Sequence, residues 1–282
     1  MKKRAYAKIN LSLDVIGKRE DGYHDLQMVM VPLELHDLIS LEIAQDYNFS
    51  VNVRYLDHKK NNIIYETIEE MRSRYGFKEN FSVELIKYIP TQAGLGGGSS
   101  DAAATIILVD RLLKMFLSIE EMEDIAIKIG KDVSFCLHNQ AALVEGAGER
   151  LTFFENNCDF EVLLVKPSQG ISTKTAYGRL ADHDIRRFPA DDIMEALKTD
   201  NYQGVIDNLG NSFEEVAGDI LPVINKIKSE LSDYGFDGNL LCGSGSCVFG
   251  LTRDAQLCES AVGHFRKEYP YVWKTKVKRT RL

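Results

Sequence analysis

Four glycines and two serines stand close together between Pro90 and Ser100, where the chain reads Pro-Thr-Gln-Ala-Gly-Leu-Gly-Gly-Gly-Ser-Ser. Because glycine has no Cβ atom, the backbone N–H groups of such a segment can converge on an anion without steric interference. The serines add hydroxyl donors, and an apolar helix expected from about residue 101 to 116 would direct its positive N-terminus at the same place. We therefore predict a phosphate-binding loop made of Pro90, Thr91, Gln92, Ala93, Gly94, Leu95, Gly96, Gly97, Gly98, Ser99 and Ser100.

The alternative for this segment is a flexible loop in which Ser99 or Ser100 only caps the following helix. Three well-known nucleotide loops do not fit. The Walker A pattern is absent, the third glycine of a Rossmann fingerprint is replaced by Ser99, and the protein-kinase motifs are missing.

A second candidate site lies near the N-terminus, where apolar and polar residues alternate from residue 5 to 15. This period of two predicts a half-buried strand. Lys8 and Asn10 then project together from its polar face. For Lys8 the simplest reading is a solvated strand lysine, the usual state of lysine side chains.

The rest of the chain mixes strand and helix patterns without regular βαβ alternation, which predicts an α+β protein of two domains. An Asn-rich and acidic stretch at 154–159 suggests the boundary, giving domains 1–156 and 157–282. Strands are expected at 26–35, 38–43, 49–55, 81–88, 162–166 and 272–278, and helices at 62–75, 191–198, 204–216, 219–234 and 255–268. Ser118 and Glu121 form a capping-box pattern that opens a further helix, which Gly130 ends.

Composition excludes several classes of protein. The net charge is −8, from 34 basic and 42 acidic residues, so binding to nucleic acid or to anionic lipid is not expected. A basic cluster at Lys274, Lys276, Lys278, Arg279 and Arg281 reads as a solvated last strand and tail, with binding to an anionic partner as the alternative. No apolar run is long enough to span a membrane, and the five cysteines show no zinc-ligand spacing. We expect a cytoplasmic protein with reduced cysteines, no metal-ligand residues and no membrane partner.

The segment Pro90-x-x-x-Gly-Leu-Gly-Gly-Gly-Ser-Ser-Asp101 resembles the signature loop of the galactokinase, homoserine kinase, mevalonate kinase and phosphomevalonate kinase (GHMP) superfamily. Ala7-Lys-Ile-Asn-Leu11 resembles the first motif of that family. Cys242-Gly-Ser-Gly-Ser-Cys-Val-Phe249 resembles its C-terminal glycine motif. The resemblance implies an ATP-dependent small-molecule kinase that uses Mg²⁺. It also implies an N-terminal half like ribosomal protein S5 domain 2 and a ferredoxin-like C-terminal half.

Lys18-Arg-Glu-Asp-Gly-Tyr-His24 is similar to a motif of one branch of the family, which phosphorylates a CDP-linked polyol in non-mevalonate isoprenoid biosynthesis. That resemblance implies cytosine binding by Tyr23 and His24, with Tyr177 as a second stacking aromatic. It further implies substrate contacts at Asn10, Thr173, Gly243, Ser244 and Gly245, with Ile171-Ser172-Thr173 opening a loop. The alternatives are a core tyrosine for Tyr23 and a turn histidine for His24.

The family's catalytic carboxylate lies in a Gly-Ala-Asp-Val-Pro-Phe segment, which corresponds here to Gly130-Lys-Asp-Val-Ser-Phe135. The resemblance therefore implies Asp132 as the base that accepts the hydroxyl proton. Lys8 would hold the hydroxyl in register with Asp132 and stabilise charge on the transferred phosphoryl group. Asp132 could instead be only the N-cap of a short helix.

This chain departs from the family pattern at Lys131, Ser134 and Cys242. Two alternatives to a kinase for the CDP-linked polyol therefore stay open: a GHMP paralogue acting on another small alcohol, and a non-catalytic nucleotide or metabolite sensor. For oligomeric state, a monomer or weak homodimer is expected.

Overall fold

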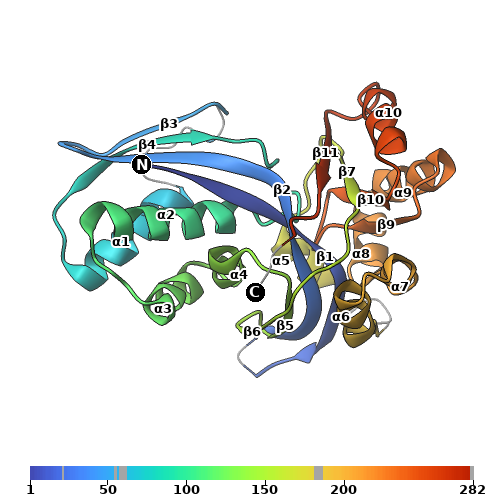
Figure 1. Cartoon of the computed structure of the whole chain (residues 1–282), viewed down its shortest axis with the longest axis horizontal. Coiled ribbons are helices and arrows are strands. Elements are labelled where there is room, and N and C mark those ends of the chain that lie inside the picture. Colours follow the sequence, from blue (N-terminus) through green and yellow to red (C-terminus); the bar gives the residue numbers. More distant parts are fainter. Residues whose placement is uncertain (21, 54–55, 57–61, 181–186, 280–282) are drawn as a thin grey trace. The chain divides into compact units, whose positions relative to one another are not determined.

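A computed structural model describes residues 1–20, 22–53, 56, 62–180 and 187–279 (Figure 1). The chain divides into two compact units of three segments each. Unit 1 consists of Met1–Ala7, Leu35–Ile89 and Gly96–Asn139, and unit 2 of Lys8–Glu34, Pro90–Leu95 and Gln140–Leu282. Two long strands, β1 (Lys2–Lys18) and β2 (His24–Ala44), run through both units. The domain boundary predicted at residue 156 stays a prediction.

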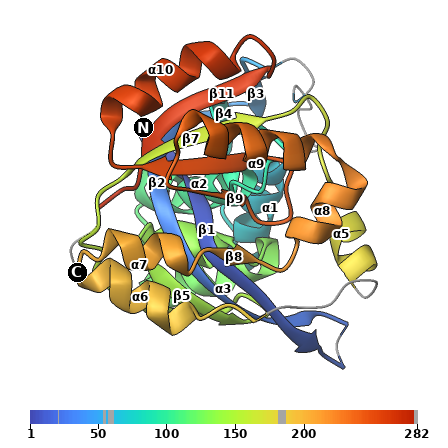
Figure 2. The same cartoon turned by 90° about the vertical axis from the view of Figure 1, so that its right-hand side faces the viewer.

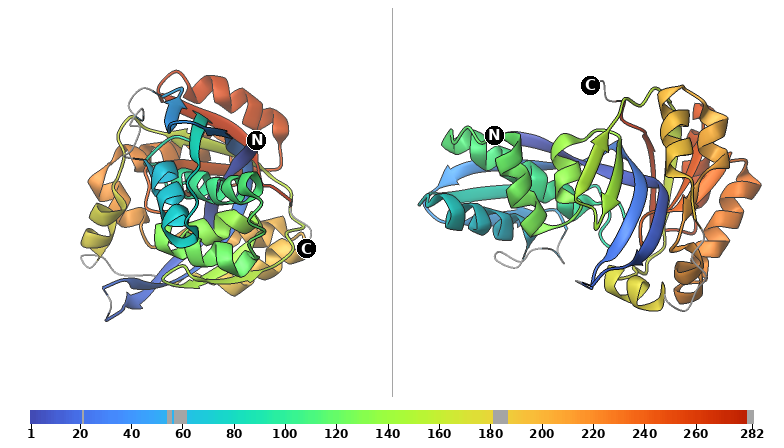
Figure 3. Two further views of the ribbon diagram at one scale, coloured as in Figure 1. Left: turned by 90° about the vertical axis from the view of Figure 1, so that its left-hand side faces the viewer. Right: turned by 90° about the horizontal axis from the view of Figure 1, so that it is seen from below.

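In unit 1, strand β4 (Asn80–Ile86) pairs antiparallel with the second half of β2, from Leu38 to Ala44. On its other side β4 pairs in parallel with β3 (Asn48–Val51). The helices pack against one another (Figure 3, left). They are α1 (Ile63–Tyr75), α2 (Gly97–Leu113), α3 (Ile119–Ile129) and α4 (Val133–His138).

Local capping signals decide the bounds of two of these helices. The Asn62 side chain accepts a hydrogen bond from Tyr65 N at the start of α1, and Gly76 ends that helix with φ 72°. The predicted capping box of Ser118 and Glu121 is confirmed at the start of α3, as is the stop at Gly130. The first turn of a helix has N–H groups without intrahelical partners, and nearby side chains can accept from them. The starts of these two helices could therefore be predicted from the local sequence.

Three predicted element bounds in the first half of the chain were wrong. Residues 26–35 and 38–43 belong to a single strand, β2, because the break expected around Asp37 is absent. The Asp37 side chain is instead held by hydrogen bonds from the backbone of Tyr88 and Ile89. Helix α2 begins at Gly97 rather than Asp101, so the end of the glycine-rich segment is its first turn. The predicted strand 49–55 ends at Val51, and its residues 54 and 55 lie outside the described part.

Unit 2 contains an antiparallel sheet in the order β11-β7-β10-β9. Its strands are β7 (Glu161–Lys166), β9 (Gly238–Leu241), β10 (Val248–Thr252) and β11 (Tyr271–Lys276). Helices α9 (Val223–Tyr234) and α10 (Ala255–Phe265) pack on this sheet (Figure 2). The strands of this sheet and the two helices on it follow one another as β7, α9, β9, β10, α10 and β11, as in a ferredoxin-like β-α-β-β-α-β unit.

The remaining elements of unit 2 are a hairpin on the first half of β2 and four shorter helices. Strand β5 (Ala142–Gly146) pairs with β2 from Leu26 to Met30 and forms a hairpin with β6 (Arg150–Phe153). The other helices are α5 (Thr173–Arg179), α6 (Ala190–Lys198), α7 (Tyr202–Asp207) and α8 (Glu214–Ile220).

The helix predicted at 204–216 is wrong, because strand β8 (Gly210–Asn211) interrupts it by pairing with Ser12 and Leu13 of β1. The Asn211 side chain also donates to the carbonyl oxygens of Leu241 and Gly243. Residues 210 and 211 are therefore held in a strand by distant partners and do not continue the helix. The helix predicted from residue 219 begins only at Val223, after Pro222. Proline is well tolerated at a helix start but not in its interior.

The strand predicted at 5–15 exists, but its half-buried character is wrong. Its apolar face is buried, and so are Lys8, Asn10, Ser12 and Asp14 on the polar face. Alternation marks the two faces of a strand, but it does not say that the polar face meets solvent. Burial of a lysine is uncommon, so the polar face of β1 calls for a functional explanation.

The basic residues near the C-terminus are paired with acidic side chains of unit 2. Lys276 Nζ lies 2.7 Å from Glu161, Lys274 Nζ lies 3.0 Å from Glu259, and Arg279 lies 3.5 Å from Asp159. Arg281 lies outside the described residues. The pairing favours an ordinary charged strand over a free anion-binding patch. Within the described ranges, no helix has both the length and the apolar character that a membrane span requires.

Candidate active site

The predicted loop meets the C-terminal glycine motif inside unit 2. A Cβ atom on Gly94 would lie 1.7 Å from the carbonyl oxygen of Cys242, and Gly94 has φ 76°. Any side chain at residue 94 would therefore push the two segments apart and strain the backbone. Glycine at this position is required by the close approach as well as by the conformation.

Lys8 and Asn10 lie against the same junction. The Lys8 backbone N donates to Leu95 O at 3.0 Å, and its Nζ donates to Asn10 Oδ1 at 2.9 Å. The Asn10 amide donates in turn to Met28 Sδ at 3.1 Å. With only 5% of its surface exposed, Lys8 is a buried cation beside the loop rather than a solvated strand lysine.

The glycine motif forms the turn between β9 and β10. Gly243 has φ 52° and Gly245 has φ 92°. A Cβ atom on Gly243 would lie 3.2 Å from Gly94 O and 3.7 Å from Asn10 Oδ1, so the turn backbone faces the loop and the Lys8 strand. The Ser244 hydroxyl lies 3.2 Å from that of Thr173. Unit 2 therefore brings together six of the predicted residues: Lys8, Asn10, Gly94, Thr173, Gly243 and Ser244.

Thr173 does not open a loop, as the sequence suggested, but begins helix α5. The Ser172 side chain caps this helix by accepting a hydrogen bond from Thr175 N. Ser172 and Thr175 are small hydroxyl residues, which favour a helix start as readily as a loop. Thr173 is therefore fixed on a capped helix beside the glycine turn.

The aromatic residues assigned to the base form a second group in unit 2. The rings of His24 and Tyr177 have centroids 4.9 Å apart, and Tyr177 packs edge-on against Phe213 at 4.8 Å. Tyr23 exposes 54% of its surface, so it is not a core tyrosine. Burial and the nearby Lys18 lower the pKa of His24. A neutral imidazole keeps one donor and one acceptor nitrogen, which suits recognition of a polar base edge.

The rest of the loop belongs to unit 1. Gly96 has φ 70° and precedes α2, whose first turn contains no acidic residue. An acidic side chain there would compete with a bound anion for the positive end of the helix. Among the described residues, Ser100 Oγ is buried without a hydrogen-bond partner. The start of α2 therefore offers backbone N–H groups and a hydroxyl to an anion.

Asp132 lies just before α4 in unit 1 and is partly buried. It occupies the N-cap position, but its side chain makes no capping hydrogen bond to α4 within the described structure. The alternative considered for this residue therefore holds for its N-cap position but not for a capping hydrogen bond. Its role as a base stays a prediction.

Known proteins match the chain over most of its length. Profiles of the GHMP kinases N terminal domain and the GHMP kinases C terminal domain match residues 62–146 and 193–270. A protein of Bacillus cereus (strain B4264) called 4-diphosphocytidyl-2-C-methyl-D-erythritol kinase is 37% identical over 250 residues, 88% of this chain and 86% of the relative. A Bacillus licheniformis protein of the same name is 40% identical over 252 residues, 89% of this chain and 87% of the relative.

The chain belongs to the GHMP kinases.

A crystal structure of 4-(cytidine 5'-diphospho)-2C-methyl-D-erythritol kinase agrees with this GHMP kinase with a TM-score of 0.85. Its sequence is 28% identical, and the match covers 99% of this chain and 100% of that one. The predicted two-domain GHMP fold is confirmed, as is the activity class of a small-molecule kinase with ATP as co-substrate. The individual site residues stay predictions.

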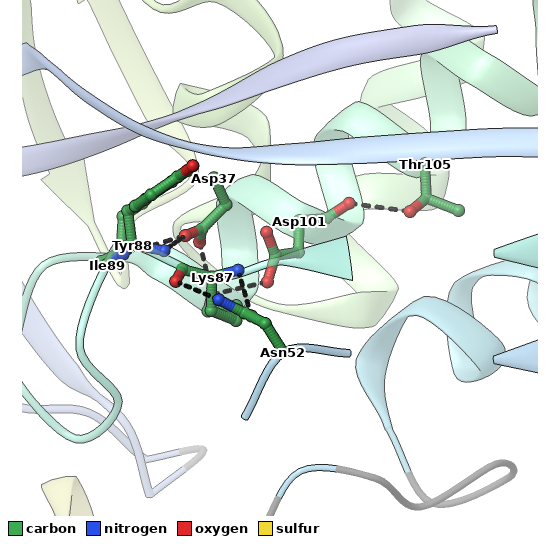
Figure 4. A network of polar contacts seen from close by, with 7 residues as sticks. All are labelled: Asp37, Asn52, Lys87, Tyr88, Ile89, Asp101 and Thr105. Atoms are coloured by element: carbon green, nitrogen blue, oxygen red, sulfur yellow. Dashed lines mark hydrogen bonds and ion pairs between the residues drawn. The ribbon is translucent and has the colours of Figure 1, made fainter. Parts of the chain in front are cut away.

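The sequence analysis missed one polar cluster in this kinase, and Figure 4 shows it. The side chains of Asp37, Lys87 and Asp101 meet in the interior of unit 1. The signal in the sequence was weak: Asp37 comes just before an apolar pair in a predicted strand region, and Asp101 comes just before three alanines of a predicted apolar helix. Charged residues are rarely buried unless they are paired, so a buried acidic residue at these positions indicates a partner elsewhere in the chain.

Proposed function

We propose that this GHMP kinase transfers the γ-phosphoryl group of ATP to a hydroxyl of 4-diphosphocytidyl-2-C-methyl-D-erythritol, in non-mevalonate isoprenoid biosynthesis. The observation that carries the proposal is identity of 37% and 40%, over nearly nine tenths of the chain, to relatives of that name. The contact between His24 and Tyr177 supports it, because it supplies an aromatic surface and a neutral imidazole for a cytosine ring.

The chemistry assigned to unit 1 is proton transfer and phosphate binding. Asp132 accepts the proton of the substrate hydroxyl, whose oxygen attacks the γ-phosphorus while the bond to the bridging oxygen of ADP breaks. The N–H groups from Gly96 to Ser100 bind phosphate oxygens at the positive end of α2. Because phosphoryl transfer depends mainly on positioning and charge neutralisation, a fixed loop matters as much as the base.

The chemistry assigned to unit 2 is charge neutralisation and substrate recognition. Lys8 stabilises negative charge on the transferred group, with its ammonium oriented by Asn10 at 2.9 Å. Gly243, Ser244, Gly245 and Thr173 contact the polyol diphosphate. Tyr23, His24 and Tyr177 bind the base.

The residues present also fit Mg²⁺ as the ion that accompanies ATP. Within the part of the chain that the structure describes, no group of three or more His, Cys, Asp or Glu side chains could hold a metal ion. Mg²⁺ needs no such group, because it keeps several waters and is held by substrate phosphates with one or two protein oxygens. The orphaned hydroxyl of Ser100 is a suitable oxygen. The bound ion would neutralise phosphate charge during transfer.

The test is ATP turnover by the purified protein with Mg²⁺ and the CDP-linked polyol, compared with mevalonate, phosphomevalonate, homoserine and galactose. ADP release with the CDP compound alone is expected, with a loss of at least about a hundredfold in kcat for Asp132→Asn and for Lys8→Ala. Asp124→Asn and Lys128→Ala, which alter surface ion pairs of unit 1, are the matched controls and should keep full activity.

Turnover with another alcohol in place of the CDP compound would point to a paralogue. ATP binding without turnover of any alcohol would point to a sensor. Retained activity in Asp132→Asn would remove the base from the mechanism but not the substrate assignment.

We further propose a cytoplasmic enzyme that acts as a monomer or weak homodimer. All five cysteines are free and buried, as is usual for proteins of a reducing compartment. Light scattering after gel filtration, over a tenfold range of concentration, would give the oligomeric state.

A further inference from the structure

The cluster of Asp37, Lys87 and Asp101 ties together both ends of the glycine-rich segment (Figure 4). Lys87 Nζ donates to Asp101 Oδ2 at 2.8 Å and also to Asp37 Oδ2. Asp37 Oδ1 accepts hydrogen bonds from Tyr88 N at 2.6 Å and from Ile89 N at 2.9 Å. Tyr88 and Ile89 are the residues just before Pro90, and Asp101 is the residue just after Ser100.

The backbone around this cluster is fixed by further bonds within unit 1. Lys87 N donates to Asn52 Oδ1 at 2.8 Å, and Asn52 Nδ2 donates to Lys87 O at 3.2 Å. On the other side, Thr105 Oγ1 donates to Asp101 O at 2.8 Å within α2. The entry of the loop is therefore anchored to β2 and to the residue after β3, and its exit to helix α2.

The loop also lies close to the cluster at Gly97. A Cβ atom on Gly97 would lie 3.0 Å from Ile89 Cγ2 and 3.3 Å from Lys87 Nζ. Gly97 is the first residue of α2, whose N–H groups are assigned to phosphate. The first residue of the phosphate-binding helix therefore lies close to the Lys87 ammonium, with little space for a side chain between them.

We propose that Asp37, Lys87 and Asp101 form a loop clamp, which holds the entry and the exit of the glycine-rich loop at a fixed separation and so positions it for ATP. Lys87 and Asp101 are positioning residues that act through the loop. This inference rests on the proposed binding of ATP by the loop, but not on the identity of the alcohol substrate.

A purely stabilising role explains the cluster less well. The three side chains are buried, and two carboxylates share one ammonium, which leaves an excess negative charge when all are ionised. Buried ion pairs contribute little stability compared with apolar residues of similar volume. Their value lies in directional contacts, and here each contact reaches one end of the same loop.

The protonation of Asp101 agrees with this arrangement. Asp101 Oδ1 has no hydrogen-bond partner among the described residues, and burial raises the pKa of the carboxyl to about 7 despite the opposing Lys87. A proton on Asp101 leaves one negative and one positive charge in the clamp. The bond between Lys87 and Asp101 Oδ2 does not require the second negative charge.

The decisive variant is Lys87→Met combined with Asp101→Leu, because it removes both partners of the Lys87–Asp101 bond and so cuts the link between the two loop ends. Asp101→Asn is its matched control, since an amide oxygen still accepts from Lys87. Lys128→Met controls for loss of a lysine, because its partner Glu70 is at the surface. The dissociation constant of ATP is measured by calorimetry without alcohol substrate, in the presence of Mg²⁺, on variants shown by circular dichroism to be folded.

The double variant is expected to bind ATP about tenfold or more weakly, which corresponds to about 1.4 kcal/mol. Asp101→Asn and Lys128→Met are expected to stay within about threefold of the wild type. In turnover assays the KM for ATP should rise, while the KM for the alcohol changes little. If the cluster were purely structural, its disruption would lower the stability of the protein and leave the ATP affinity of the folded protein unchanged.

Each outcome is informative. Unchanged ATP affinity in the folded double variant, or equal weakening of ATP and alcohol binding, overturns the clamp. If the double variant does not fold, Asp101→Leu takes its place, and unchanged ATP affinity there overturns the clamp equally. ATP binding by the wild type without turnover contradicts the proposed substrate only, whereas no ATP binding by the wild type contradicts both.

Discussion

Apart from Lys8, each of the two units contains a buried lysine, and these two lysines differ in the groups that surround their ammonium. Lys87 in unit 1 contacts two carboxylates, and although burial opposes it, these charges raise the pKa of Lys87. Lys166 in unit 2 donates to the carbonyl oxygens of Pro167 at 3.1 Å and Gln169 at 3.4 Å and lies over the Tyr271 ring. Burial lowers the pKa of Lys166.

The difference shows that burial alone does not determine what a charged residue contributes. Lys87 balances charges that would otherwise be buried without a partner, so the side chains around it depend on its presence. Lys166 satisfies neutral carbonyl groups, which lose less than a buried charge does when the partner is removed. We expect substitutions at the two positions to have very different effects on stability.

The largest effect is expected for Lys87→Met, which leaves Asp37 and Asp101 buried without a cation. The free energy of unfolding should fall by roughly 3–5 kcal/mol. Urea unfolding followed by circular dichroism measures it, with Lys128→Met as the control. A loss below about 1 kcal/mol, the usual value of a surface pair, would show that the two carboxylates do not depend on Lys87.

A smaller effect is expected from pH, through Asp101. The folded protein raises the pKa of this carboxyl to about 7 from an ordinary value of 3.8, so between these values the folded state binds more protons than the unfolded state. Stability contributed by the protonated form is therefore lost as pH rises, by roughly 2–3 kcal/mol between pH 5 and pH 8.

The side chain introduced by Asp101→Asn cannot ionise, so this variant should not show the loss of stability between pH 5 and pH 8. Unfolding free energies of the wild type and Asp101→Asn at pH 5 and pH 8 give the comparison. If stability changed equally with pH in the two proteins, Asp101 would be excluded as the source of the pH dependence.

The smallest effect is expected for Lys166→Met. Gln169 O also accepts a hydrogen bond from Ser246 Oγ at 2.6 Å, so only the Pro167 carbonyl loses a donor. The free energy of unfolding should fall by about 1–2 kcal/mol, because one buried carbonyl is left without its donor. If Lys166→Met destabilised the protein as much as Lys87→Met, the chemistry of the partners would not explain the difference between the two lysines.

Local patterns predicted much of this fold, and the failures share a physical cause. The capping box at Ser118, the stop at Gly76 and the period-two strand at residues 5–15 depend on neighbouring residues, and all three were found. The break in the predicted helix 204–216 depends on pairing with Ser12 and Leu13, which are distant in sequence. The uninterrupted strand at Asp37 depends on backbone donors some fifty residues later.

The candidate site shows the same division. The glycine-rich loop was identified from its composition, because few other functions require so many glycines together. Its contact with Cys242 and the burial of Lys8 could not be predicted, since both depend on how separate segments pack. The loop clamp was missed for the same reason: each member looks ordinary until the three meet.

Because every cysteine is buried, chemical labelling of the thiols reports when part of the protein unfolds. Cys136 lies in unit 1, whereas Cys158, Cys242, Cys247 and Cys258 lie in unit 2. A maleimide added to the folded enzyme reacts only when a buried thiol becomes exposed, so labelling follows local or global unfolding. The mass of the first labelled species then identifies the part that opens first: one added label indicates unit 1, and four indicate unit 2.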